Sequence, residues 1–207
     1  MTIRVGFDYD EPIFPWYDYA HDASVAAGLT SSDAPPPTRW DPHSQYGCTI
    51  DEWFAVLDRE VEKGDEGMYM RPCKASSVEW VNRLYDGGYE VYLITARGSF
   101  GTLGHVIKDL TKRQIEREGI KNHGLYFAPD KMEVIRDLRL DYFIDDRPKH
   151  FAEAMEAGAD AYLLDERWNR DFEVPYSKRV YSVPEFARRI VRRHGYSPNQ
   201  RVFTEIV

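Results

Sequence analysis

The sequence predicts an α/β protein with a parallel β-sheet that carries helices on both faces. Two alternating sequence patterns favour this fold class. From about residue 76 onward, short apolar runs typical of buried strands alternate with segments whose apolar residues recur at helical spacing. Such strand–helix alternation is typical of a parallel sheet wrapped by helices. Residues 15–75 interrupt this rhythm and are too long for a tight strand-to-helix connection, so they are expected to form an inserted, largely helical cap.

The first predicted strand ends in a group of carboxylates. It lies in "VGFDYDEPIF", residues 5–14. Because a strand alternates its faces, Asp8 and Asp10 should leave its end pointing the same way, with Tyr9 turned aside. Two like charges held that close raise each other's pKa or require a cation. An Asp-rich turn after a strand is also common for local hydrogen-bonding reasons, so this stretch alone leaves both interpretations open.

The insert at residues 15–75 contains one clear helical pattern. The segment "TIDEWFAVLDREVEKG" (49–64) begins with Thr49 and Glu52 at the spacing of a capping box. The Pro/Ser/Asp-rich stretch at 31–44 is not expected to form a regular element. The insert has more aromatic residues than a disordered loop would carry, among them Trp16, Trp40, Tyr46 and Trp53.

The remainder of the chain predicts the sheet and its helices in turn. Ser76 and Glu79 have capping-box spacing, and Pro or Gly marks the ends of several later helices. We therefore expect a core formed by residues 1–14 and 76–207 and a cap formed by 15–75. Helices are predicted at 76–88, 106–119, 130–138, 147–158 and 184–194. Strands are predicted at 89–95, 124–129, 141–145, 161–165 and 179–183.

Composition and charge narrow the classes of function. The 207 residues are 43% hydrophobic and 30% charged, as in ordinary globular proteins. A net charge of −8 argues against non-specific binding to nucleic acid, which requires a basic surface, and leaves room for a small anionic ligand. Cys48 and Cys73 show no disulfide pattern, and no charged-then-apolar leader or bilayer-spanning run occurs. We therefore expect a cytoplasmic protein that does not bind membranes.

Polar residues follow the predicted strands at the ends where parallel sheets bind ligands. The first strand delivers Asp8 and Asp10, the second delivers Thr95, and a later strand delivers Asp145 and Asp146. Lys131 begins a helix after the third strand. Four uncompensated carboxylates in one crevice would repel severely, and oxygen ligands of this type suit Mg²⁺. Each residue alone has an ordinary structural explanation, but their placement at successive strand ends predicts a metal and phosphate site.

On these residues the chain resembles the haloacid dehalogenase-like phosphohydrolase superfamily. The motifs "FDYD", "LITAR", "PDK" and "FIDDRP" occur in the order and context of that superfamily. The resemblance covers almost the whole chain and implies a Rossmann-like core. Because the cap follows the first motif and the last motif reads "IDDRP", the chain looks most like the 5′(3′)-deoxyribonucleotidase branch, phage-type relatives included. In a phage-encoded chain, the expected cytoplasm would be that of the host.

The resemblance implies a role for each motif residue. Asp8 would be the nucleophile that forms an aspartyl-phosphate, and Asp10 would be the acid and base. Phosphate oxygens would be held by Thr95, Ala96 and Lys131. Mg²⁺ would be held by Asp8, the backbone carbonyl of Asp10, Asp145 and Asp146, with Asp146 in direct contact and Asp145 supporting it. We expect the rings that discriminate between substrates to lie just after the nucleophile, at Phe14, Trp16 and Tyr17, and we expect Trp53 to belong to the core of the cap.

One departure from the family pattern leaves several functions open. The family usually has Gly after the second Asp, where this chain has Glu11-Pro12. If the turn needs a positive φ there, a non-glycine residue costs roughly 1–2 kcal/mol. The alternatives are a nucleoside or deoxynucleoside 5′-monophosphate phosphatase, a polynucleotide 3′-phosphatase or sugar-phosphate phosphatase, and a catalytically weakened nucleotide-binding or interaction protein. The basic run at 188–195 favours a polynucleotide slightly, whereas the net charge disfavours it. The oligomeric state is also open, a homodimer being one option.

Overall fold

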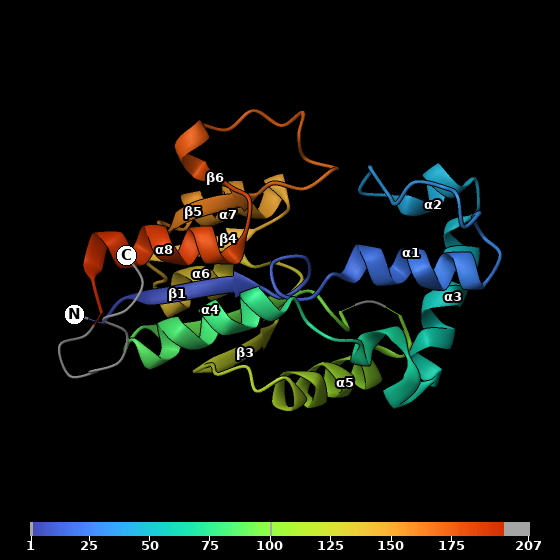
Figure 1. Cartoon of the computed structure of the whole chain (residues 1–207), viewed down its shortest axis with the longest axis horizontal. Coiled ribbons are helices and arrows are strands. Elements are labelled where there is room, and N and C mark those ends of the chain that lie inside the picture. The colour runs from blue at the N-terminus through green and yellow to red at the C-terminus, as the bar shows by residue number, and fades with distance from the viewer. Residues whose placement is uncertain (1, 100, 197–207) are drawn as a thin grey trace.

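The computed structural model describes residues 2–99 and 101–196 and contains a six-stranded parallel sheet (Figure 1). The strands lie in the order β3-β2-β1-β4-β5-β6, and each neighbouring pair is parallel. This is a doubly wound order, in which ligands bind beyond the carboxyl ends of the strands where the order reverses. The predicted α/β fold is confirmed. The strands are β1 Arg4–Asp8, β2 Glu90–Thr95, β3 Gly124–Phe127, β4 Tyr142–Asp145, β5 Asp160–Leu164 and β6 Arg179–Val180.

Helices cover both faces of the sheet. On one face, α4 (Ala75–Asp86) and α8 (Val183–His194) pack together in a cluster that includes Phe7 of β1. On the other, α6 (Met132–Leu138) and α7 (Pro148–Glu156) enclose a cluster that includes Phe143 of β4. Because side chains alternate along each strand, the strands supply apolar residues to both clusters.

A helical segment follows β1 and lies to one side of the sheet (Figure 1). Its own apolar cluster contains Trp53, Val56 and Leu57, and it extends to Leu110 of α5 (Gly104–Arg117). Trp53 is 8% exposed in this cluster, as expected of a core residue. We call residues 15–75 the cap. Its elements are α1 Trp16–Ala26, α2 Pro42–Tyr46, α3 Ile50–Glu62 and two short 3-10 turns, η1 Gly64–Glu66 and η2 Met68–Met70.

The two chain segments that join the cap to the sheet run beside each other. The amide of Lys74 donates to the carbonyl of Ile13 at 2.8 Å. The Tyr19 hydroxyl donates to the carbonyl of Pro72 at 2.7 Å. These bonds fix where the cap begins relative to the end of β1.

Several local predictions need correction. The capping box of Thr49 and Glu52 is present, but the one predicted at Ser76 and Glu79 is wrong. The reason is that α4 begins at Ala75 and Lys74 occupies the N-cap without a side-chain bond. The cap also holds α1 and α2, which lack a clear amphipathic pattern in sequence. In α2, Pro42 occupies the first turn, where its missing N–H costs nothing.

The described residues include no helix long and apolar enough to cross a membrane. Both cysteines, Cys48 and Cys73, carry free thiols. The third 3-10 turn, η3 (Tyr176–Lys178), precedes β6, which is shorter than the sequence predicts.

Candidate active site

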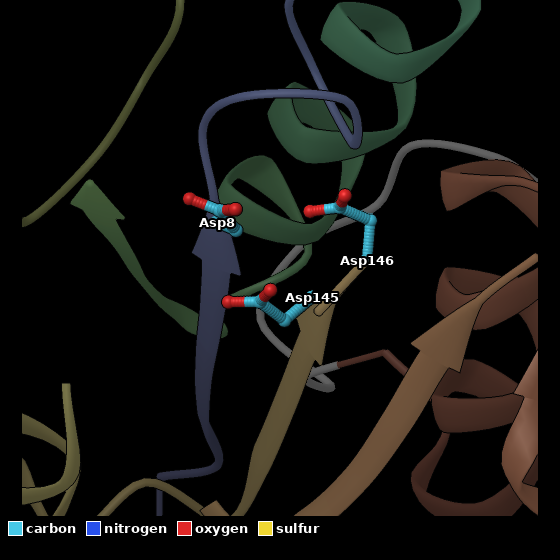
Figure 2. Close-up of side chains that lie close together, drawn as sticks. All are labelled: Asp8, Asp145 and Asp146. Atoms are coloured by element: carbon cyan, nitrogen blue, oxygen red, sulfur yellow. The ribbon is translucent and has the colours of Figure 1, made fainter. Parts of the chain in front are cut away.

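Three carboxylates meet at the point where the strand order reverses. Asp8 ends β1, Asp145 ends the neighbouring β4, and Asp146 follows directly. One oxygen of each lies within 4.8 Å of the others, and all three side chains are buried. Figure 2 shows them converging from the two strand ends. The parallel pairing of β1 and β4 therefore brings together three of the four carboxylates that the sequence places in this group, and Asp10 is not one of the three.

Lys131 provides a positive charge to this group. It lies between β3 and α6, is 1% exposed, and places Nζ 2.7 Å from Asp8 Oδ1 and 2.6 Å from Asp145 Oδ2. Burial and the charge of Asp145 raise the pKa of Asp8 well above its usual value, although Lys131 opposes this. Burial and the neighbouring carboxylates likewise raise the pKa of Asp146. An added cation would relieve this repulsion, and an all-oxygen donor set fits a hard divalent ion such as Mg²⁺.

Asp145 differs from Asp146 in how it is held. Its Oδ1 accepts from the amide of Arg147 at 2.8 Å, and its Oδ2 is 3.2 Å from Nδ1 of His150 as well as close to Lys131. Burial alone would raise its pKa, but Lys131 and His150 outweigh burial and hold the pKa of Asp145 at about 2. Asp146, in contrast, lines the cavity described below. This geometry suits Asp146 for direct contact with a metal and Asp145 for support.

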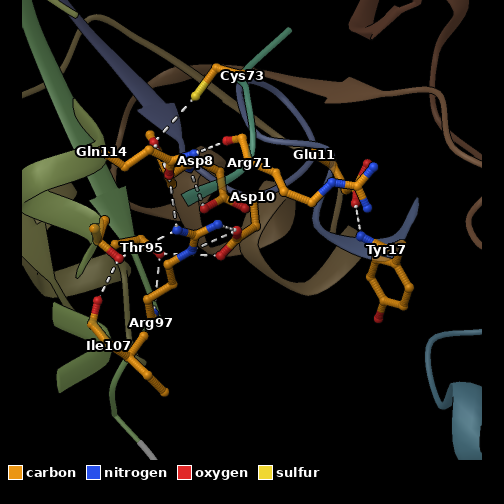
Figure 3. A network of polar contacts seen from close by, with 12 residues as sticks. Asp8, Asp10, Glu11, Tyr17, Arg71, Cys73, Thr95, Arg97, Ile107 and Gln114 are labelled. Atoms are coloured by element: carbon orange, nitrogen blue, oxygen red, sulfur yellow. Dashed lines mark hydrogen bonds and ion pairs between the residues drawn. The ribbon is translucent and has the colours of Figure 1, made fainter. Parts of the chain in front are cut away.

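The turn after β1 carries Asp10 into the same region. Asp8 Oδ1 accepts from the amide of Tyr9 at 2.7 Å, and the Tyr9 ring is fully buried in the core. Asp8 and Asp10 both line the cavity, as the alternation of the strand predicts. Figure 3 shows Asp10 beside the Arg97 side chain, with Thr95 close to both. Thr95 ends β2, and Arg97 follows it by two residues. The Thr95 hydroxyl is 3.4 Å from Asp10 Oδ2, and Nε of Arg97 donates to Asp10 Oδ1 at 2.8 Å.

Glu11 adopts the left-handed conformation that glycine usually supplies. Its φ is 69°, and its side chain is buried rather than turned to solvent. One carboxylate oxygen accepts from the amide of Tyr17 in the first turn of α1 at 2.7 Å, and the other lies 3.6 Å from Nζ of Lys74. Burial raises the pKa of Glu11 to about 7, although Lys74 acts in the opposite direction. The turn thus has a positive φ at a residue other than glycine, and Glu11 ties the turn to the cap.

A cavity of about 730 Å³ lies between the strand ends and the cap. Its core side includes three carboxylates and three neighbouring residues, namely Asp8, Asp10, Asp146, Ala96, Lys131 and Arg147. The helix α3 contributes one continuous stripe of residues, and η2 contributes Tyr69. The aromatic residues of the cap that line the cavity are Trp16, Tyr17, Trp40, Trp53, Phe54 and Tyr69. The cavity is therefore acidic and cationic at one end and aromatic at the other, and we call these six aromatic residues the aromatic wall.

The predicted aromatic residues lie in different places. Trp16 packs edge-on against Trp53, with ring centroids 5.7 Å apart, and the Tyr17 ring lies 4.2 Å from that of Trp168. Both line the cavity. Phe14 is 0% exposed and stacks on Tyr9 inside the core. The structure does not bring Phe14 to the aromatic wall, because the chain turns back toward α4 before α1 begins.

Sequence reasoning missed the residues that support the acidic group. The Trp168 indole donates to Asp146 Oδ2 at 2.8 Å. Asn169 donates to the carbonyl oxygens of Asp146 and Leu164, and His150 contacts Asp145 as described. Trp168 and Asn169 follow β5, so inspecting the end of that strand, as was done for the others, would have found them. His150 carries no such signal, because it lies within α7.

Comparisons with known proteins agree with this geometry. No protein-family model matches the chain. An Oceanobacillus iheyensis protein named "Putative nucleotidase OB0422" is 31% identical over 137 residues, which cover 62% of this chain and 71% of that protein. The chain belongs to its family. A Bacillus cereus protein named "Putative nucleotidase" is 24% identical over 144 residues, 64% of this chain and 69% of that one.

Solved structures of other proteins share the fold of this chain. A haloacid dehalogenase-like hydrolase from Streptococcus pneumoniae superposes with a TM-score of 0.61 at 15% identity, covering 91% of this chain and 98% of that chain. The Bacillus subtilis HAD-hydrolase YfnB, described as bound to magnesium, gives a TM-score of 0.54 at 14% identity over 92% and 99% of the two chains. The protein therefore has the fold of haloacid dehalogenase-like hydrolases, in agreement with the motifs of its sequence.

Proposed function

We propose that this protein is a Mg²⁺-dependent phosphatase that removes the phosphate of a nucleoside or deoxynucleoside 5′-monophosphate through an aspartyl-phosphate on Asp8. The observation that carries the proposal is the cavity itself. It joins an acidic group with a buried lysine at one end to an aromatic wall at the other. The first end suits a metal and a phosphate, and the second suits a flat base. The names of the two nucleotidase relatives support the same substrate class.

The metal would be held by Asp8, Asp146 and the backbone carbonyl of Asp10, with Asp145 behind them. The magnesium described for YfnB supports this choice of ion. When bound, Mg²⁺ would supply positive charge to the phosphate oxygens and cancel the repulsion between the carboxylates. The attack on phosphorus and the proton transfers would be carried out by side chains of the protein.

Asp8 would attack phosphorus, and this role is supported by its position at the end of β1, where it lines the cavity. Lys131 lies beside Asp8 and would bind a non-bridging oxygen of the phosphate. The resemblance implies the same role for Thr95, whose hydroxyl contacts Asp10, and for Ala96, which lines the cavity. Asp10 would protonate the leaving oxygen and later accept a proton from the hydrolytic water.

Two features bear on the alternative functions. Glu11 adopts a positive φ, the conformation that a glycine at this position would supply most easily, so the absence of glycine does not argue against an active enzyme. The basic run at 188–195 lies in α8 and ends near the start of the sheet, where Tyr142 of β4 hydrogen-bonds with His194. That edge is opposite the cavity, so the run does not favour a polynucleotide substrate at this site.

The test is phosphate release from a panel of substrates with Mg²⁺ and with EDTA. The panel contains nucleoside and deoxynucleoside 5′-monophosphates, sugar phosphates and an oligonucleotide with a 3′-phosphate. We expect the mononucleotides to be hydrolysed fastest, activity to vanish in EDTA, and activity to return with Mg²⁺. Full activity in EDTA would contradict the metal, and preference for another member of the panel would contradict the substrate.

A further inference from the structure

Arg97 lies deep in the cavity wall, and none of the roles assigned so far includes it. It follows Thr95 by two residues, its side chain is 2% exposed, and it contributes to the cavity lining. Its guanidinium lies over two aromatic rings of the core and one of the cap. The distance from Cζ to the ring centroid is 4.1 Å for Phe14, 4.7 Å for Tyr9 and 5.5 Å for Tyr69 of the cap. An arginine this deeply buried is costly unless a specific partner compensates its charge.

That partner is Asp10. Both Nε and Nη2 of Arg97 approach the same oxygen, Oδ1 of Asp10, at 2.8 and 2.7 Å. On the other side, Nη1 lies 3.3 Å from the Thr111 hydroxyl and 3.5 Å from the amide oxygen of Gln114. Nη2 makes no hydrogen bond of good geometry within the described part of the chain, so its close approach to Asp10 is its compensation. The side chain is thus fixed along its length and directed at one carboxylate oxygen.

The other oxygen of Asp10 is held much more loosely. Asp10 Oδ2 has a long contact of 3.4 Å with the Thr95 hydroxyl, and the Asp10 side chain is 27% exposed. The backbone amide of Arg97 donates to the same Thr95 hydroxyl at 3.1 Å. One residue therefore orients Asp10 through its side chain and Thr95 through its backbone.

We propose that Arg97 is a positioning residue for Asp10, holding Oδ1 so that Oδ2 faces the leaving oxygen of the substrate. This inference rests on the proposed function. As the bond between phosphorus and the leaving oxygen breaks, the proton on Oδ2 passes to that oxygen, and the attacking water later returns a proton to Oδ2. Arg97 touches neither the substrate nor the proton. Its contribution is to keep a mobile two-carbon side chain in the one orientation that reaches the leaving group.

The test compares leaving groups. A mononucleotide expels an alkoxide and needs the proton from Asp10, whereas p-nitrophenyl phosphate expels a stable phenolate and does not. We expect Arg97→Met to lower kcat about 100-fold on a nucleoside 5′-monophosphate, the size expected for a misplaced acid, and less than 5-fold on p-nitrophenyl phosphate. Asp10→Asn should show the same selectivity. The double variant Asp10→Asn/Arg97→Met should lose no more than about 2-fold beyond Asp10→Asn alone, because Arg97 then has no acid to position.

Two further variants separate positioning from folding. Arg97→Lys keeps a charge that can reach Asp10 and should recover part of the mononucleotide activity, and it provides the comparison if Arg97→Met does not fold. Arg113→Met removes a half-exposed arginine paired with Asp65 of the cap and should leave both activities unchanged. Equal losses on both substrates, or multiplying losses in the double variant, would mean that Arg97 is only structural.

The experiment also separates this inference from the proposed function. If the unmodified protein hydrolyses mononucleotides and Arg97→Met shows no leaving-group selectivity, only the positioning role fails. If it hydrolyses p-nitrophenyl phosphate but no mononucleotide, the substrate assignment fails, and β-glycerophosphate takes its place as the substrate with a poor leaving group. If it hydrolyses no phosphomonoester with Mg²⁺, both proposals fail.

Discussion

The two sides of the cavity hold their side chains in different ways. On the core side, Asp145 is fixed by Lys131, His150 and a backbone amide, and Asp146 by the Trp168 indole. On the cap side, rings mainly contact other rings, edge-on or tilted. Directional bonds hold groups to within tenths of an ångström, whereas ring packing tolerates adjustment. We infer from this difference that the core side catalyses the reaction and the cap side binds the part of the substrate beyond the phosphate. Each prediction below tests that division.

The largest effect should come from Asp8. Asp8→Asn removes the nucleophile, so no aspartyl-phosphate can form, and activity on every substrate should fall below detection. Asp10→Asn keeps the nucleophile and should lose about 10²–10⁴-fold on mononucleotides, the usual worth of acid–base catalysis. Steady-state rates and trapping of the phosphoenzyme measure both. Because p-nitrophenyl phosphate needs little protonation, its phosphorylation step should partly rescue Asp10→Asn and never Asp8→Asn. Equal, unrescued losses would mean that the two roles are misassigned.

Substitutions of Asp146 and Asp145 should differ in their effects on Mg²⁺ binding and on stability. Asp146→Ala removes a carboxylate that lines the cavity and should weaken Mg²⁺ binding by more than 100-fold. Asp145 does not line the cavity and would only support the residues that contact the metal, so Asp145→Ala should weaken Mg²⁺ binding about 10–100-fold. Asp145→Ala should in addition cost about 3 kcal/mol of unfolding free energy, because Lys131 and His150 lose a buried partner.

Magnesium titrations of activity and urea unfolding of both variants measure this contrast. Metal binding that suffers more from Asp145→Ala than from Asp146→Ala would reverse their assignment. An unchanged unfolding free energy in Asp145→Ala would show that the buried pairs contribute little.

The strands and helices of the core could be predicted from sequence because each one has a pattern of apolar residues within its own segment. Each buried strand is a short apolar run, and parallel pairing alone brings Asp8, Thr95 and Asp145 to one edge. The residues that complete the site depend on packing between distant segments. Trp168 reaches Asp146 across 22 positions, and Arg97 reaches Asp10 across 87. No spacing rule indicates such contacts.

The cap was harder to predict because its rings serve two purposes. Trp53 belongs to the cap's apolar cluster and also lines the cavity, whereas Phe14 is buried in the core. Aromatic residues have the same sequence signal in both settings, so their identity does not tell which rings face a ligand. Helix α1 was missed for a related reason, since its buried positions include His21 and Ser24 rather than a clear apolar stripe.

Removing a ring from the aromatic wall should have an intermediate effect, confined to the binding of nucleotides. Trp16→Ala removes a ring that lines the cavity, and stacking on a base is worth roughly 1–3 kcal/mol. KM for nucleoside monophosphates should therefore rise about 5- to 100-fold, while p-nitrophenyl phosphate is barely affected. Initial rates over a range of substrate concentrations give both values. Tyr176→Ala, at a ring 77% exposed near β6, is the matched control and should change neither. Equal losses on both substrates would mean that Trp16 is structural.

The smallest expected effect is a change in stability from substituting Glu11, in the turn that joins β1 to the cap. Glu11 has a φ of 69° and binds the first turn of α1 and Lys74. Glu11→Ala removes these contacts but keeps a β-carbon in the left-handed conformation, whereas Glu11→Gly removes both the contacts and the strain. The glycine variant should therefore be more stable than the alanine variant by about 1 kcal/mol in urea unfolding. Both should retain activity on p-nitrophenyl phosphate, because Asp8 and Asp10 are still presented by the same turn. If the alanine variant is as stable as the glycine variant, the positive φ carries no cost in solution, and the turn after β1 must differ from the one described here.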